Sequence, residues 1–128
     1  KDTITPWNQK AISPPKKILL TADSRRIMVL RWINEDDIFY IIVEINDYPI
    51  DVVISENMLL VENNDVPGVI GNVGRILGEE QVNIATMHVG RKENSAIMLL
   101  TVDDAVEEKS IKKLEEFEQI RKVKYLNL

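Results

Sequence analysis

Cysteine is absent from this 128-residue sequence, and histidine occurs once, at His88. Without cysteine there can be no disulfide bonds, no thiolate catalysis and no zinc ribbon. With one histidine, a Ser–His–Asp hydrolase would depend on His88 alone. We therefore expect no metal site in this chain.

Long apolar runs and dense clusters of basic residues are also missing. No apolar run approaches the roughly 18 residues that a membrane-spanning helix needs, and no secretory signal pattern is visible. The formal net charge is −5, which disfavours a nucleic-acid partner because phosphate binding needs a basic surface. We expect a cytoplasmic protein that binds neither nucleic acid nor membranes. The chain opens at Lys1 rather than at a methionine, so we also expect it to be a piece of a longer protein.

Composition divides the sequence into three stretches. Residues 1–17 form an irregular lead-in, where three prolines remove backbone donors and no apolar period appears. Residues 18–57 are rich in Ile, Val, Leu and aromatic residues, which is typical of β-strands. We predict strands at 17–22, 25–33, 38–45 and 50–54, with turns at 34–37 and 46–49. Because so small a sheet is marginal alone, we expect it to pack on another chain.

Residues 58–128 follow a different pattern, in which apolar residues recur at helical spacing between strand-like runs. We predict a strand at 58–63, a helix at 67–80, strands at 81–89 and 95–102, a helix at 106–119 and a strand at 123–128. This order predicts an α+β fold, namely a ferredoxin-like βαββαβ domain preceded by the small β-rich segment. Both helices are expected on one face of a four-stranded antiparallel sheet.

Three glycines lie inside the first predicted helix, at Gly71, Gly74 and Gly78. Each costs about 1 kcal/mol relative to alanine in a helix interior. We therefore expect them to permit a close approach, with the helix packed tightly on the sheet. Pro67 suits the first helical turn, where its missing N–H has no partner to lose.

Signals of catalysis are weak. The glycines are spaced G-x-x-G-x-x-x-G, unlike the G-x-G-x-x-G of a dinucleotide loop, and there is no P-loop. The many carboxylates, such as Asp103 and Glu107, fit a solvated face better than an acid–base pair. His88 fits a pH-sensitive or ligand-contacting role, but we favour an ordinary polar position on a strand, because no second histidine or cysteine accompanies it. We predict no catalytic residue and no cofactor in this chain.

The loop 63–68, "NNDVPG", is the best candidate for a binding site. Asn63 and Asp65 end a strand and lead into a helix N-terminus, whose free N–H groups can hold a carboxylate. Asp65 can bind an ammonium group, Gly68 lets the backbone approach closely, and Asn83 adds an amide that both donates and accepts. Together they suit an amino acid. The alternative is that these are ordinary turn and capping residues, and composition alone slightly favours that alternative.

Longer motifs resemble a known family. "DVPGVIGNVGRILG" (65–78), "NIATMHVGR" (83–91), "SAIMLLTVDD" (95–104) and the ending "VKYLNL" resemble the C-terminal ACT domain of D-3-phosphoglycerate dehydrogenases. The resemblance runs from about Met58 to Leu128. Residues 18–57 resemble the end of the intervening, allosteric substrate-binding domain of the longer forms of that enzyme. The chain would then be a C-terminal fragment of an NAD-dependent oxidoreductase, with NAD bound elsewhere in the full-length enzyme.

The resemblance implies feedback control of serine biosynthesis. In this family L-serine binds between the ACT domains of neighbouring subunits and slows the enzyme. Carried over by position, Asn63 and Asp65 would contact the ligand beside Gly68, and Asn83 would contribute from the partner subunit. Some members have histidine or tyrosine where this chain has Asn63. A homo-oligomer joined through ACT domains is implied, with the helix glycines at or near the subunit contact.

Two alternatives remain open from the sequence. The regulatory portion of an iron–sulfur L-serine dehydratase also has an ACT domain after a β-rich segment and shares the "N-I-A-x-M-x-V" run. The other alternative is a dimerisation domain without a ligand. The run "GNVGRILG" (71–78) favours the dehydrogenase.

Overall fold

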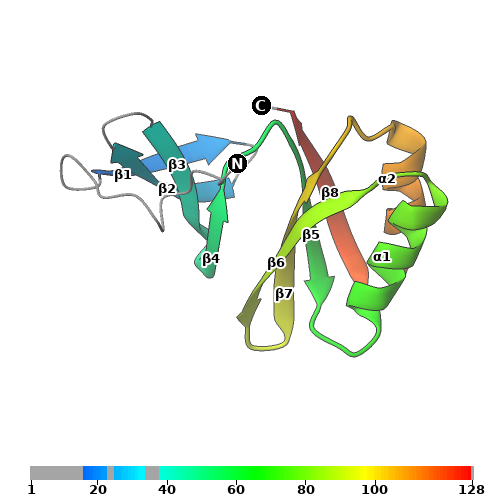
Figure 1. Cartoon of the computed structure of the whole chain (residues 1–128). Helices are drawn as coiled ribbons and strands as arrows, with labels where there is room; N and C mark the ends of the chain where they lie inside the picture. The colour runs from blue at the N-terminus through cyan, green and yellow to red at the C-terminus, as the bar shows by residue number, and fades with distance from the viewer. Residues whose placement is uncertain (1–15, 23–24, 34–37, 128) are drawn as a thin grey trace. The chain divides into compact units, whose positions relative to one another are not determined.

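A computed structural model describes residues 16–22, 25–33 and 38–127 of the chain. The described residues up to Ile54 form one compact unit, unit 1, and those from Ser55 onward form a second, unit 2 (Figure 1). The predicted lead-in before residue 16, including Trp7, and the predicted turn at 34–37 lie outside the described residues. Among the described helices, none has the length and apolar character needed to cross a membrane.

Unit 1 is an antiparallel meander with strand order β1-β2-β3-β4. Its strands are β1 (Lys16–Ala22), β2 (Arg25–Ile33), β3 (Ile38–Ile45) and β4 (Tyr48–Val53). The four predicted strands are therefore confirmed. Runs of β-branched residues favour these strands, and bulges interrupt the pairing within β2 and again within β3.

The hairpin between β3 and β4 has a tighter turn than predicted. Only Asn46 and Asp47 form it, since β4 already begins at Tyr48. Both have positive φ, 49° and 69°, which suits a two-residue hairpin turn and the Asn and Asp found there. The Asn46 side chain also accepts a hydrogen bond from the Arg26 N–H, at 2.9 Å. The predicted turn at 46–49 is too long because Pro49, a residue typical of turns, lies in the edge strand β4.

Unit 2 has the predicted βαββαβ order and is an α+β domain. Its elements are β5 (Asn57–Asn64), α1 (Val69–Glu79), β6 (Ile84–Lys92), β7 (Ser95–Val102), α2 (Glu108–Glu115) and β8 (Ile120–Asn127). The strands form one antiparallel sheet in the order β6-β7-β5-β8. Both helices lie on the same face of that sheet (Figure 1). The predicted architecture of this part is confirmed.

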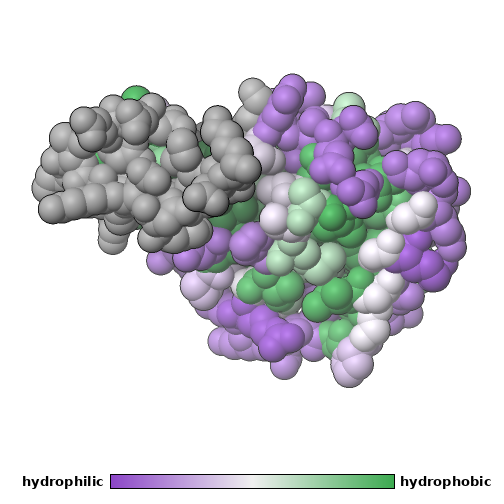
Figure 2. Space-filling model, viewed as in Figure 1, coloured by the Kyte–Doolittle hydropathy of each residue, from purple (hydrophilic) through white to green (hydrophobic). Residues whose placement is uncertain are grey.

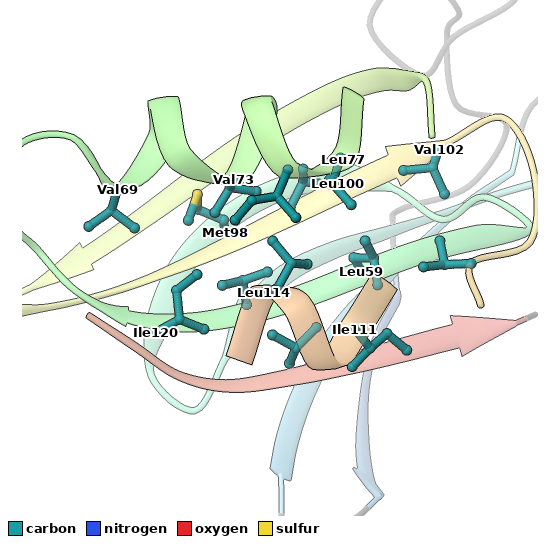
Figure 3. Close-up of a cluster of buried hydrophobic side chains, with 14 residues drawn as sticks. Leu59, Val69, Val73, Leu77, Met98, Leu100, Val102, Ile111, Leu114 and Ile120 are labelled. Carbon is teal, nitrogen blue, oxygen red and sulfur yellow. The ribbon is translucent and has the colours of Figure 1, made fainter. Parts of the chain in front are cut away.

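The core of unit 2 lies between the helices and the sheet. Alternating residues of β5 and β7, such as Leu59 and Leu100, face α1 and α2. Val73 and Leu77 of α1 and Leu114 of α2 point into the same layer (Figure 3). All five side chains are fully buried. This layer fixes α1 over the sheet and thereby sets the position of the helix N-terminus.

Both helices differ from their predicted bounds. Helix α1 begins at Val69, so the prediction that Pro67 occupies its first turn is wrong. The reason is Gly68, which has φ +91° at the N-cap and turns the chain before the helix starts. Helix α2 covers only Glu108–Glu115, shorter than the predicted 106–119. Its amphipathic pattern continues to Phe117, but the chain turns there before entering β8.

The expected reason for the α1 glycines is also wrong. A Cβ atom placed on Gly71, Gly74 or Gly78 would meet no atom of the described residues within 4 Å. These glycines therefore do not bring the helix close to the sheet, because Val69, Val73 and Leu77 make that contact instead. Within the described chain, the glycines leave a shallow, open strip along α1.

A polar contact joins the two helices at the end of α1. Glu80, the C-cap of α1, has a side chain only 7% exposed. Its Oε2 accepts a hydrogen bond from Lys113 Nζ at 2.7 Å, and its Oε1 accepts one from Ser110 Oγ at 3.1 Å. The hydrogen bond with Lys113 lowers the pKa of Glu80 and raises the pKa of Lys113. The two helices are thus held together at the end opposite the α1 N-terminus.

Candidate functional site

A surface pocket of about 350 Å³ opens at the N-terminus of α1. It lies where the end of β5, the loop 65–68 and strand β6 come together, with β7 beneath. Its volume is at the small end of the range of roughly 300–1,000 Å³ typical of ligand pockets. The lining residues are Asn63, Asp65, Val66, Pro67, Gly68, Val69, Ile70, Val89, Arg91, Ala96 and Met98.

Asn63 is the buried polar residue of the pocket. It continues the row of Leu59 and Val61 on the helix-facing side of β5 and is only 4% exposed. Its Nδ2 donates to the Asn64 carbonyl at 2.8 Å. Its Oδ1, by contrast, is buried and accepts no hydrogen bond from any described residue. Because a buried polar atom without a partner costs free energy, this oxygen points to a missing donor in the pocket.

The backbone at Asn63 and Asn64 is held by β8 and the residue just before it. The β5–β8 pairing shifts register between Glu62 and Asn63. Beyond this bulge, Arg121 donates to the Asn63 carbonyl at 3.1 Å, and the Asn64 N–H donates to the Gln119 carbonyl at 2.9 Å. The bulge and these two bonds fix the end of β5, so that the Asn63 side chain remains directed into unit 2.

The N-terminus of α1 forms one wall of the pocket. Its N-cap is Gly68, which has no side chain to accept hydrogen bonds from the first-turn N–H groups. Those N–H groups, on Val69 and the residues after it, are available to an outside acceptor. They also carry the positive end of the helix dipole. A carboxylate or another anionic group suits this wall.

Charged side chains of opposite sign line the same pocket. Asp65 Oδ1 lies 3.5 Å from Arg91 Nε, and the two side chains are 30% and 68% exposed. The Asp65 N–H also donates to the Asn94 carbonyl at 3.0 Å, which ties the loop to the turn between β6 and β7. The pocket therefore offers one negative and one positive group, beside the positive helix end.

An apolar rim surrounds these polar groups. Val66, Ile70 and Val89 are all exposed large hydrophobic residues, and all three line the pocket. In Figure 2, near-neutral and hydrophobic residues form a continuous area on the displayed face of unit 2, bordered by hydrophilic residues. The rim suits a further apolar surface, or the aliphatic part of a ligand, better than open water.

Two polar residues singled out from the sequence lie outside the pocket. Asn83, just before β6, donates from Nδ2 to Asp103 Oδ2 at 2.6 Å and is exposed. Its carbonyl accepts from the Asp103 N–H, so that it closes the connection between β6 and the end of β7. His88 is half-buried on β6, opposite Leu99 of β7. The structure thus brings Asn63, Asp65 and Gly68 together and leaves Asn83 elsewhere in the same chain.

Arg91 is the pocket residue that the sequence reasoning missed. It ends the motif "NIATMHVGR" (83–91), in which the sequence alone indicates no role for it. Strands β6 and β5 both pair antiparallel with β7 and so run in the same direction. The C-terminal end of β6 therefore lies at the same end of the sheet as the C-terminal end of β5. That strand order was the signal that could have placed Arg91 near Asp65.

The pocket suits binding rather than catalysis. It combines a buried amide oxygen, an ion pair, a helix N-terminus and an apolar rim. No group of three or more His, Asp or Glu side chains among the described residues could hold a metal ion. A small molecule with both an anionic and a cationic group matches these features.

Residues 57–119 match the ACT domain family. The D-3-phosphoglycerate dehydrogenase of Bacillus subtilis is 46% identical over 89 residues, which are 68% of this chain and 17% of that protein. The D-3-phosphoglycerate dehydrogenase of Methanocaldococcus jannaschii is 37% identical over 114 residues, 88% of this chain and 21% of that protein. Both matches are longer than unit 2 and so extend into unit 1. The chain thus spans about a fifth of these relatives.

Proposed function

Residues 57–119 belong to the ACT domain family, and on that premise we propose that this chain is an amino-acid-binding regulatory module of a D-3-phosphoglycerate dehydrogenase. The proposed ligand is L-serine, bound in the pocket at the N-terminus of α1. The observation that carries the proposal is the buried Asn63 Oδ1, which lacks a donor inside that pocket. A regulatory ligand would supply the missing hydrogen bond.

Each group of a small amino acid has a matching partner in the proposed site. The first-turn N–H groups behind Gly68 suit the carboxylate, and Asp65 suits the ammonium. Asn63 Oδ1 accepts a hydrogen bond from the ligand's ammonium or hydroxyl group. In the proposed assembly Asn83 reaches the pocket from the neighbouring subunit. Within its own chain Asn83 lies away from the pocket and donates a hydrogen bond to Asp103.

We also propose that the parent protein is an NAD-dependent dehydrogenase and a homo-oligomer joined through its ACT domains. The sequence similarity to two D-3-phosphoglycerate dehydrogenases supports the first part. The open strip of glycines along α1 supports the second, since small residues let a neighbouring subunit approach closely. The same strip supports the second candidate function, a dimerisation domain without a ligand. The cytoplasmic location stays a prediction.

A thermal melt of the chain with L-serine separates these candidates. By mass action, ligand at about 100 times its dissociation constant stabilises the fold by roughly 2.7 kcal/mol. Glycine and D-serine serve as controls for specificity. A sensor shows a rise in Tm with L-serine that D-serine does not match. If none of these amino acids changes the Tm, the chain is a dimerisation domain without a ligand.

Variants locate the binding. Asp65→Asn should abolish the rise in Tm, whereas Asp104→Asn, an exposed position with the same change of charge, should retain it. Asn83→Ala tests the contribution of the partner subunit. It should reduce the rise while the chain still dimerises. A full rise in Asp65→Asn would place the ligand elsewhere.

A further inference from the structure

We propose that Arg91 is the residue that selects for the ligand's carboxylate, and that its ion pair with Asp65 is the resting state that a zwitterion replaces. This inference rests on the proposed function, because it assumes that the pocket binds an amino acid. It adds Arg91 as a second partner of the carboxylate, beside the first-turn N–H groups of α1, and with it the class of ligand that this residue selects.

The geometry of the ion pair between Arg91 and Asp65 supports this inference. Arg91 Nε lies 3.5 Å from Asp65 Oδ1. This distance is longer than the roughly 2.7–2.9 Å of the charge-assisted hydrogen bonds with which a guanidinium binds a carboxylate tightly. The Arg91 side chain is also mostly exposed, so water screens the pair. A ligand can therefore separate the two residues at little cost.

The balance of charges in the pocket also supports the inference. Among the residues that line the pocket, Asp65 is the acidic one and Arg91 the basic one. An amine without a carboxylate would compete with Arg91 for Asp65 and leave the guanidinium unpaired. An acid without an amine would leave Asp65 unpaired. A zwitterion gives each residue a partner of opposite charge and releases the weak pair between them.

The backbone holds the two residues at a fixed spacing. Asp65 is tied through its N–H to the Asn94 carbonyl, in the turn that directly follows Arg91 and Lys92. Glu93, in the same turn, has φ +57°. The carboxylate and the guanidinium are thus mounted on two segments that are bonded to each other, as a two-point receptor requires.

Calorimetric titration of the full chain tests the proposal with two probes. L-Serine carries both charged groups, whereas L-serinamide keeps the ammonium and the hydroxyl but lacks the carboxylate. In Arg91→Gln, we expect L-serine to bind at least tenfold more weakly. L-Serinamide should bind as well as before or more tightly, because a competitor for Asp65 has been removed. Arg91→Lys should fall between, since lysine keeps the charge but loses the planar fork.

Lys92→Gln is the matched control, as an exposed neighbour on β6 with the same loss of charge that does not line the pocket. Its affinity for L-serine should stay unchanged. If Arg91→Gln weakens both probes equally, or neither, Arg91 does not recognise the carboxylate and the inference is wrong, although the proposed function stands. If the unaltered chain binds no amino acid, the proposed function fails, and the inference fails with it.

Discussion

Lys113 Nζ lies 2.7 Å from Glu80 Oε2, which joins the second helix of unit 2 to the cap of the first. Residues 33 positions apart in the sequence thus make the polar contact that holds α1 and α2 together. Because the contact depends on the ionisation of Glu80 and Lys113, the stability of unit 2 should depend on pH.

Unit 2 should lose stability in acid through Glu80. Its folded pKa is lowered from 4.5 by the hydrogen bond from Lys113, so its contribution is present above that value and is lost as the pH falls through the folded pKa. The pKa of Lys113 is raised from 10.5, so the matching loss in alkali comes only as the pH rises through that raised value. We expect Glu80→Gln to lower Tm at pH 7 and to lower it less at pH 3, which is below the unfolded pKa of 4.5.

Thermal melts at both pH values check this prediction. Glu118→Gln removes a charge from an exposed position near the end of α2 and should leave Tm unchanged at either pH. An equal drop for Glu80→Gln at pH 3 and pH 7 would mean that packing, and not the charge, explains its effect.

Alanine substitutions should have opposite effects at two glycines of the same segment. Gly68 has φ +91°, so Gly68→Ala should lower the free energy of unfolding by about 1–2 kcal/mol. At Gly71 an added Cβ meets nothing within 4 Å, so Gly71→Ala should raise it by about 0.5–1 kcal/mol. Urea denaturation measures both. A gain for Gly68→Ala would contradict the left-handed conformation at Gly68, and a loss for Gly71→Ala would contradict the open space at Gly71.

Asn63 should matter for binding more than for folding. In Asn63→Leu the unpartnered Oδ1 disappears together with the Nδ2 bond to Asn64, so Tm without ligand should change by only a few degrees. Affinity for L-serine should fall about tenfold or more, because a hydrogen bond to a charged group is worth roughly 1.5–3 kcal/mol. Titration calorimetry measures the affinity. Asn72→Ala, on α1 but outside the pocket lining, should bind L-serine normally.

The glycine strip of α1 should be part of a subunit contact. Sedimentation velocity should show the chain as a dimer at high concentration, and Gly78→Gln should shift it toward monomer. Because Gly78 has open space around its Cα within the chain, the larger side chain should leave the monomer folded. A dimer unaffected by Gly78→Gln would place the contact on another surface.

The sequence predicted the order of strands and helices better than it predicted where they begin and end. The strands predicted at 81–89 and 123–128 are β6 (Ile84–Lys92) and β8 (Ile120–Asn127). Continuous apolar runs, at 58–61 in β5 and at 96–100 in β7, mark these two strands because both are buried. The start of α1 was misplaced because two signals compete there. Pro67 favours a first helical position, but Gly68 adopts a left-handed conformation that no pattern of apolar residues reveals.

Only part of the candidate site could be predicted from the residues. Asn63, Asp65 and Gly68 stand close in the sequence, so their grouping around one pocket followed from local reasoning. Arg91 reaches Asp65 through the pairing of β6 with β7. Such a long-range contact depends on tertiary structure and has no local signal. The lack of a donor for Asn63 Oδ1 likewise becomes visible only in three dimensions.

The pairing of β5 with β8 sets Asn57 opposite Asn127, so the first and last strands of unit 2 bring their outer ends together. A short peptide could join these ends without crossing the sheet, and the loss of loop entropy would be small. Unit 2 is therefore suited to circular permutation, with new ends opened in the exposed segment at residues 103–105. The same geometry lets the unit be inserted into a surface loop of another protein through two neighbouring attachment points.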